Sequence, residues 1–437
     1  MKTRRTHVKV TKIARTLMIA VMGMLVGCGN QAPVQEKTAV KEPVQIHKAA
    51  PPIEGSTLYL AQAQFIKEPV AGSDDTKIVP GPARLDIWTF QNGEWSEEVL
   101  EDPDSNVFHK AEWFEPIEGG AGILTIGAQQ AFLKIWRKGE NGEWKGESLW
   151  NPTFGGKFDR LRDFEIADVT NDGHKEICIA THDQGVVAIA KWRGGRYEVE
   201  ELIRKSTETF VHEMEVGDVT GNGYMELFTT PSMPNKMDGS IQPGEIDMFA
   251  FDGEKWNQSV VDMLTTRHAK EIMVATLTGE DPPVVFASLE GENIGGDVAG
   301  DTTRIRMYRY VDNQFVSTDI ASLPGELCRF LTIGDTDGDG KREVIASTSK
   351  DGIWRLNPPE KEGDPWKKTL IATQTSGFEH ATFLADLNND GIEEIYVASD
   401  NQRQLRRYTW NGRGYDIDVI GKLKDDTITW NITAKKP

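Results

Sequence analysis

The stretch "LTIGDTDGDGKREVIAST", residues 331–348, joins two short apolar segments through an acidic, glycine-rich loop. Alternating apolar segments bounded by such loops are typical of antiparallel strands. The same pattern recurs in three intact copies at 164–181, 214–230 and 382–399, and in two eroded copies at 113–128 and 272–288. The repetition therefore predicts an array of strand–loop–strand units.

A second marker follows each unit: a polar turn, an aromatic residue and an alternating segment. It occurs seven times along the chain, so the full unit of about 50 to 60 residues has the size of a four-stranded propeller blade. We interpret the aromatics as packing residues between neighbouring blades. They are Trp95, Trp144, Tyr197, Trp256, Phe315, Trp366 and Tyr415.

The two ends of the repeat array complement each other. The first unit lacks an inner strand, whereas the chain ends in "DDTITWNIT", residues 425–433, a lone alternating segment. Pairing these ends would complete the first blade and remove an exposed sheet edge. The sequence thus predicts an all-β fold, a seven-bladed β-propeller spanning 55–437 and closed by the C-terminal strand.

The first 54 residues predict export and anchoring. Residues 1–27 combine a basic start with a short apolar run, which is typical of a signal peptide. The quartet "LVGC", residues 25–28, resembles the bacterial lipobox, which implies lipidation of Cys28 and an exported lipoprotein; the alternative is a buried cysteine in a signal anchor. Residues 28–54 predict a flexible tether. Gly29 favours the outer membrane, by resemblance to known sorting rules, on its periplasmic or surface-exposed side.

The net charge argues against nucleic acid as a partner, and the cysteine content argues against a disulfide framework. Removing residues 1–27 takes away six basic and no acidic side chains, so the formal charge of −19 becomes −25. Such an acidic chain is not expected to bind nucleic acid, because binding to phosphates needs a basic surface. Cys178 and Cys328 lie in apolar segments and are predicted to be buried free thiols.

Each intact acidic loop carries oxygen-bearing side chains at its positions 1, 3, 5 and 9 and a glycine at position 6. Alternate oxygens on a tight loop suit a hard cation, and the closing glutamate comes too early for an EF-hand. We expect structural Ca²⁺ at up to four sites; the alternative is a hydrogen-bonded turn without metal. The predicted ligands are Asp168, Thr170, Asp172, Glu176; Asp218, Thr220, Asn222, Glu226; Asp335, Asp337, Asp339, Glu343; and Asp386, Asn388, Asp390, Glu394.

These repeats resemble the FG-GAP/VCBS family, found in integrin α-subunit propellers and in secreted bacterial proteins. The resemblance covers nearly the whole chain after the tether, with the acidic motif intact in four units. It implies Ca²⁺ bound in these loops on the lower face of the propeller.

The opposite face carries a second aligned pattern. Six positions before the first predicted metal ligand stand cation-capable residues, which predict a basic pocket for an anionic ligand such as a glycan or a protein carboxylate. The alternative is pairing with acidic neighbours such as Asp163, Glu213 and Glu271. The aligned residues are Arg162, His212, Arg329 and His380, with His109 and Lys270 in the eroded units.

Three functions follow as hypotheses. The first is a membrane-anchored binding module that presents this pocket. The second is a propeller-type polysaccharide lyase or sugar dehydratase, in which His212 and His380 would move protons and Arg162 and Arg329 would clamp the anion. The third is a scaffold for envelope assembly, which needs no pocket.

Overall fold

The described part of the chain is built from strands alone. The computed structural model describes residues 50–437 except 70–75, 156–158, 183, 235, 237, 280–281, 297–301, 350–351, 376 and 378–379, and it assigns 29 strands and no helix to this part. None of these residues belongs to a helix long and apolar enough to cross a membrane. The predicted signal peptide, the lipidation site Cys28 and nearly all of the tether lie outside the described residues.

Five sheets in the described part have four antiparallel strands each. The first contains β9 (Leu161–Ala167), β10 (Glu176–Thr181), β11 (Val186–Arg193) and β12 (Arg196–Arg204). The second contains β13 (Phe210–Gly217), β14 (Glu226–Ser232), β15 (Gly244–Phe251) and β16 (Trp256–Leu264). The third contains β17 (Ala269–Ala275), β18 (Val284–Leu289), β19 (Thr302–Val311) and β20 (Gln314–Pro324). The fourth contains β21 (Cys328–Gly334), β22 (Glu343–Thr348), β23 (Gly352–Asn357) and β24 (Lys367–Ala372). The fifth contains β25 (Thr382–Ala385), β26 (Glu394–Ser399), β27 (Gln404–Trp410) and β28 (Tyr415–Lys422).

The remaining nine strands form one larger sheet. Its strand β1 pairs with β3 on one side and with the C-terminal β29 on the other, in a register from Thr57↔Lys435 to Gln64↔Thr427. Only Ala63↔Val107 joins β1 to β5, and β2 extends β1 outward. The strands are β1 (Thr57–Pro69), β2 (Thr76–Pro80), β3 (Ala83–Gln91), β4 (Glu94–Asp102), β5 (Val107–Phe114), β6 (Gly122–Ala128), β7 (Leu133–Lys138), β8 (Trp144–Trp150) and β29 (Thr427–Lys435).

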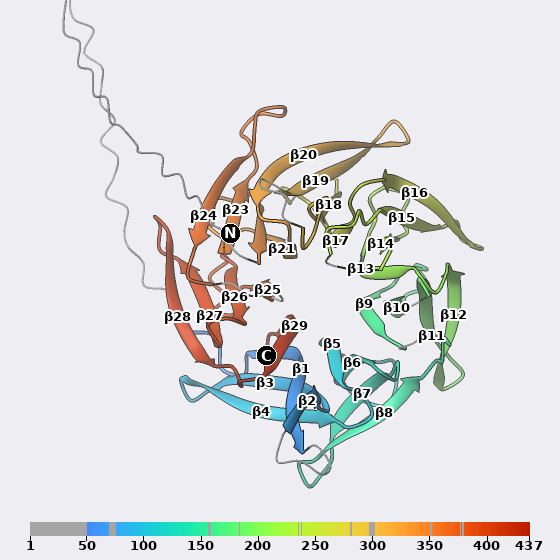
Figure 1. Cartoon of the computed structure of the whole chain (residues 1–437), viewed down its shortest axis with the longest axis vertical. Helices are drawn as coiled ribbons and strands as arrows, with labels where there is room; N and C mark the ends of the chain where they lie inside the picture. Colours follow the sequence, from blue (N-terminus) through green and yellow to red (C-terminus); the bar gives the residue numbers. More distant parts are fainter. Residues whose placement is uncertain are drawn as a thin grey trace, which may run out of the picture. The chain divides into compact units, whose positions relative to one another are not determined.

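Within the unit Gln45–Pro437, the sheets stand around a common centre (Figure 1). The strands nearest the centre are β5, β9, β13, β17, β21, β25 and β29, and each contacts the next around the circle, with β29 contacting both β25 and β5. This arrangement is consistent with a β-propeller, so the prediction of an all-β propeller is confirmed at that level.

Apolar side chains fill the space between neighbouring sheets. Tyr197 packs on Phe114 of the preceding sheet with 6.1 Å between ring centroids, and Phe315 packs on Phe228 at 6.0 Å. The interpretation of these aromatics as packing residues is therefore confirmed. Burying a phenylalanine side chain stabilises the fold by roughly 1.5–3 kcal/mol. Cys178 and Cys328 are buried and free, as predicted.

Asp86 on β3 is a buried carboxyl group whose proton should affect stability. Burial raises its pKa from 3.8 to about 7, although Arg84, 2.6 Å away, lowers it. Between about pH 4 and about pH 7 the folded chain keeps a proton that the unfolded chain has released, so the free energy of unfolding falls as pH rises through this window. We expect this fall to be smaller in Asp86→Asn, measured by urea denaturation across the window.

The exposed turn residue Asp312 provides the control, because Asp312→Asn changes the same chemical group without burial. Its pH profile should follow that of the wild type. Parallel profiles for the wild type and Asp86→Asn would contradict the assignment.

Candidate functional site

The predicted cation positions gather at the starting ends of the inner strands, but they are buried there. Four of them are the extra residue of a β-bulge, where the register to the neighbouring strand slips, and His212 lies with Glu213 in the corresponding slip of β13. A bulge re-aims a side chain that would otherwise follow the pleat, and bulges are frequent beside active sites. All six are no more than 5% exposed, namely His109, Arg162, His212, Lys270, Arg329 and His380.

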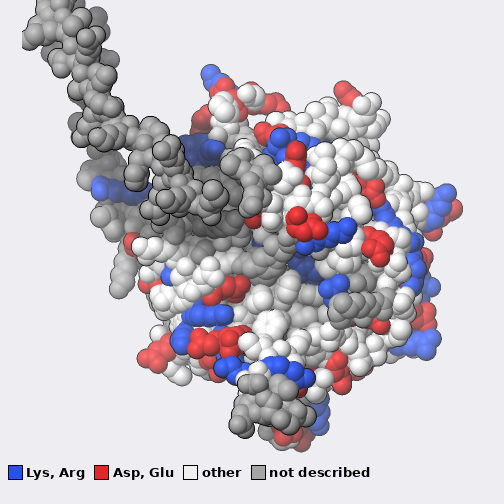
Figure 2. Space-filling model, in the orientation of Figure 1, with Lys and Arg blue, Asp and Glu red and all other residues white. Residues whose placement is uncertain are grey.

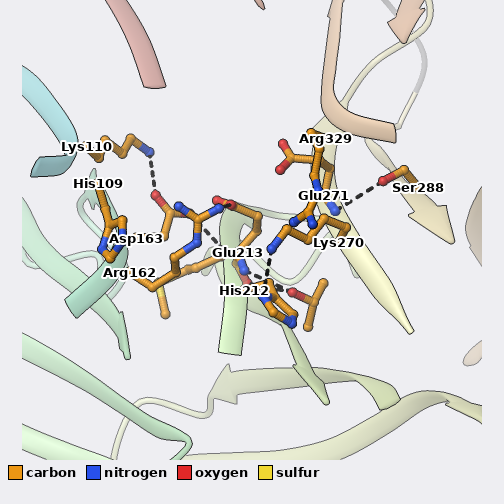
Figure 3. Close-up of polar contacts among 12 residues, drawn as sticks. His109, Lys110, Arg162, Asp163, His212, Glu213, Lys270, Glu271, Ser288 and Arg329 are labelled. Carbon is orange, nitrogen blue, oxygen red and sulfur yellow. Dashed lines mark hydrogen bonds and ion pairs between the residues drawn. The ribbon is translucent and has the colours of Figure 1, made fainter. Parts of the chain in front are cut away.

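His212 lies in a directed chain of hydrogen bonds. Its Nδ1 accepts from Lys270 Nζ at 3.0 Å, and its Nε2 lies 3.0 Å from Ser232 Oγ. Because the Ser232 hydroxyl donates to the Met233 carbonyl at 2.9 Å, Nε2 carries the ring proton and donates to Ser232. Burial, and then the Lys270 charge, hold the pKa of His212 well below its usual range. Both ring nitrogens of this neutral imidazole are thus engaged. Figure 3 shows the contact with Lys270.

A second buried group, which the sequence did not suggest, is Glu290 directly after β18. One of its oxygens lies 3.4 Å from Arg329 Nε and the other 3.2 Å from His268 Nε2. Burial raises the pKa of Glu290, but Arg329 and His268 outweigh it and lower the pKa to about 2. Arg329 therefore neutralises an internal carboxylate.

The two predicted acid/base histidines are not brought together. His380 precedes β25 and its Nε2 lies 2.7 Å from Thr375 Oγ1, while burial lowers its pKa to about 4. In the described part of the chain, no hydrogen bond or ring contact joins it to His212. His109 is also separate: its Nδ1 lies 2.5 Å from the Leu161 carbonyl and its ring packs edge-on against Trp430.

A pocket of about 250 Å³ opens between the inner strands, and its polar lining is mostly acidic. Side chains alternate along a strand, so the residue after each bulge and the residue two positions later both face the pocket. Asp163 and Glu165 on β9 are an example. The opposite side of the pocket is largely apolar, with Met273, Phe330 and Phe383. The charged lining residues are Lys110, Glu112, Asp163, Glu165, Glu213, Glu215 and Glu271.

This lining differs from the expected basic pocket. Arg162 Nη2 binds Glu213 Oε1 at 2.8 Å, which is the ion pairing that the sequence left open as the alternative. On the face turned to the viewer, acidic and basic side chains are intermixed and form no single basic patch (Figure 2). The bulged cations thus lie behind the carboxylates that line the pocket.

Asp163 and Glu213 form a carboxyl pair at the centre of this lining. Asp163 accepts from the backbone amides of Phe164 and Met214 at 2.9 Å each, and Lys110 Nζ lies 3.1 Å from it. Burial raises the pKa of Glu213 well above its usual range against the effect of Arg162, and Glu271 and a hydrogen bond to Asp163 raise it further. The raised pKa favours the protonated form of Glu213, while both side-chain oxygens of Asp163 accept hydrogen bonds from backbone amides. Figure 3 shows the two residues side by side.

Burial also raises the pKa of neighbouring carboxyl groups in the lining. Burial raises the pKa of Glu165 to about 7, although Lys110 lowers it. Burial likewise raises the pKa of Glu112 and, together with the Glu165 charge, that of Glu215. The pocket consequently carries less negative charge than its six carboxyl groups suggest.

The four acidic loops share one hydrogen-bond pattern. The first aspartate of each loop accepts hydrogen bonds from two backbone amides of its own loop, as Asp168 does from Asp172 and Gly173. The closing glutamate accepts from the backbone amide of the residue after that aspartate, as Glu176 does from Val169. The glycine at position 6 has φ between 84° and 88° in all four loops, a conformation that favours glycine. In each loop, the first aspartate and the closing glutamate are thus held by hydrogen bonds from backbone amides of the same loop.

Two of these loops also fit a metal ion. Asp168, Asp172 and Glu176 bring one oxygen each within 4.8 Å of one another, and Asp335, Asp337 and Glu343 do the same. In the second loop, Oδ1 of Asp337 is buried without a hydrogen-bond partner. The loops beginning at Asp218 and Asp386 form no comparable group of carboxylates among the described residues.

Comparisons with known proteins find similar folds among solved structures. No family model matches the chain, and no curated protein matches it. Two crystal structures described as a "putative 6-phosphogluconolactonase" are similar. The protein from Bacteroides fragilis has a TM-score of 0.52 and 12% identity, covering 88% of this chain and 98% of its own. The protein from Bacteroides uniformis has 0.51 and 13%, covering 88% and 100%.

The predicted membership of the FG-GAP/VCBS family is therefore wrong. The similar structures are propellers of the 6-phosphogluconolactonase type, and no family model supports the repeat assignment. The acidic loops suggested this family because their aspartates, glycine and glutamate match its motif. A hydrogen-bonded turn needs the same residues whether or not it binds a metal. At this level of identity, the similarity shows the fold alone.

Proposed function

We propose that the chain forms a seven-bladed propeller with hydrolase activity towards a neutral sugar derivative, a sugar lactone. For the fold, the support is that β29, β1, β3 and β4 make one four-stranded blade and that β5 to β8 make a second within the larger sheet. These two blades and the five separate sheets add up to seven.

The observation that carries the proposed activity is the Asp163–Glu213 pair in the central pocket. Two carboxyl groups that share one proton provide a base and an acid at the same pH. Asp163 would accept a proton from water as the water oxygen bonds to the lactone carbonyl carbon. The ring carbon–oxygen bond would then break, and the leaving oxygen would take the proton of Glu213. Transfer back across the pair would restore the starting state.

The charge and size of the pocket favour this substrate. The pocket offers one lysine beside six carboxyl groups, so it provides little positive charge to bind the carboxylate of a uronate. Protonated and ionised carboxyl groups can both hydrogen-bond to an uncharged polyhydroxylated ring. A pocket of about 250 Å³ suits a monosaccharide-sized ligand. The two similar Bacteroides proteins are each described as a "putative 6-phosphogluconolactonase", which agrees with a lactone ring as the substrate, although the lactone in that name carries a phosphate.

The test measures ring opening of D-glucono-1,5-lactone in a pH-stat. We expect Asp163→Asn and Glu213→Gln each to lower kcat by 10²- to 10⁴-fold, the usual contribution of a positioned acid or base. The activity of the wild type should fall as pH rises through the elevated pKa of Glu213, because the acid is then lost.

Glu254→Gln, on an exposed turn, is the matched control and should leave kcat unchanged. Melting temperatures identify variants that fail to fold. Lactone opening that is equally fast in the folded Asp163→Asn and Glu213→Gln variants would exclude the pair as the catalytic centre.

The other functions remain testable in the same preparation. A lyase acting on acidic sugars, with His212 and His380 as candidate acid and base residues, would release unsaturated products that absorb in the ultraviolet. A binding module for an anionic glycan or protein would bind without turnover. A scaffold for envelope assembly would show neither property.

We also propose structural Ca²⁺ in the loops beginning at Asp168 and Asp335, held by the carboxylates that converge there. A cation bound only to the folded state raises stability in proportion to the logarithm of its concentration. We expect millimolar Ca²⁺ to raise the melting temperature relative to excess chelator. The rise should be smaller in Asp335→Asn than in Asp218→Asn, whose loop lacks the cluster. Identical melting curves with Ca²⁺ and with chelator would count against the metal.

For localisation, we propose that Cys28 carries a lipid that anchors the exported chain, in the outer membrane. The support is the basic and apolar leader that ends in "LVGC". Cells fed an alkyne-tagged fatty acid should label the wild type but not Cys28→Ser. Equal labelling of both would overturn the anchor.

A further inference from the structure

The sheet β21–β24 departs from the other blades at one connection. Its outer hairpin, between β23 and β24, runs through residues 358–366, whereas the corresponding hairpins elsewhere have two to five connecting residues. A propeller blade needs only a tight turn here. The nine-residue connection contains Pro358, Pro359 and Pro365, and it is an addition that the fold itself does not require.

The same hairpin lacks the aromatic pair that five of the other six outer hairpins have. In five hairpins an aromatic before the turn contacts the aromatic after it, with centroids 5.0–5.4 Å apart. Aligning the strands places Pro358 where the next blade has Trp410. The aromatic after this connection, Trp366, packs on Phe286 of the preceding sheet at 6.1 Å, as Tyr197 packs on Phe114. The ring that is missing from this hairpin is therefore the one before the turn.

A pocket of about 530 Å³ occupies this place, between the connection and the acidic loop that begins at Asp335. Its volume lies within the range of small-molecule sites. Its charges nearly balance, with four carboxylates against three cations. The lining residues are Asp337, Asp339, Lys341, Arg355, Asn357, Pro358, Pro359, Glu360, Asp364, Pro365 and Lys367.

Besides Oδ1 of Asp337, which belongs to the proposed Ca²⁺ site, two buried polar atoms in this lining have no hydrogen-bond partner: Nε of Arg355 and Oδ1 of Asn357. Leaving such an atom unsatisfied costs roughly 1–3 kcal/mol, so each calls for a ligand or water atom. The guanidinium of Arg355 cannot turn away easily. Its Nη1 binds Asp337 Oδ2 at 3.0 Å and the Tyr415 hydroxyl at 3.2 Å, and it lies 4.8 Å from the Trp410 ring centroid.

We propose that this pocket binds a neutral carbohydrate through a pair of adjacent hydroxyl groups. A hydroxyl both donates and accepts, so two neighbouring hydroxyls can accept from Arg355 Nε and donate to Asn357 Oδ1. A metal ion cannot accept from the N–H group of Arg355, and the four carboxylates disfavour an anion. The three prolines provide apolar surface for the C–H face of a sugar ring. This site is separate from the central pocket and does not depend on lactone hydrolysis.

The test uses calorimetric titration of the folded chain with cellohexaose, mannohexaose and xylohexaose, each with and without chelator. We expect at least one of them to bind, and Asn357→Leu to weaken that binding at least tenfold. A second variant replaces residues 359–365 with Gln-Asn-Gly-Glu, the sequence of residues 91–94, which keeps the Asn357↔Lys367 register. It should abolish binding while the melting temperature stays near that of the wild type.

Arg413→Ala, an exposed change in the 411–414 turn of the neighbouring blade, is the control and should bind as the wild type does. Asp163→Asn should also bind normally, which separates this site from the proposed hydrolase. The proposal is overturned if none of the three saccharides binds, or if both pocket variants bind them as tightly as the wild type.

Discussion

The pairing of β1 with β29 is the constraint on which the rest of the structure depends. It joins residues more than 350 positions apart in sequence and continues from Thr57↔Lys435 to Gln64↔Thr427. Without it both strands would be open edges, and β25 and β5 would lose their common neighbour. The inner strands surround a common centre (Figure 1). The carboxyl groups that line the central pocket come from several of these strands, so they converge only when the circle is closed.

Around the central pocket, carboxyl groups form the lining and most of the cations are buried behind it. The β-bulges turn Arg162 and Lys270 behind the lining, where they stabilise carboxylates and the neutral His212, while the lining itself carries Asp163 and Glu213. Burying a carboxylate costs free energy unless it is paired with a cation or protonated. Glu290 is paired with Arg329, and the pKa of Glu213 is raised. The cations thus allow many acidic groups to lie in one small pocket.

The two candidate sites arise in different ways. The central pocket is built from equivalent positions of several blades, so it is a property of the repeat. The pocket beside Arg355 exists because one blade departs from the repeat, with a long connection and without the aromatic pair. Loops that exceed what the fold requires often carry binding, because they can change without unfolding the sheet.

The sequence by itself determined the strands, the acidic turns, the packing aromatics and the complementary ends, because each follows from local alternation and turn chemistry. It also located the positions of Arg162, His212, Lys270 and Arg329, but it could not show that these are bulged and buried. Which side chains face the pocket, and therefore its acidic character, was decided by the tertiary structure. The physical reason is that a one-residue bulge reverses the direction of a side chain, and that pairing between distant strands decides which charges meet.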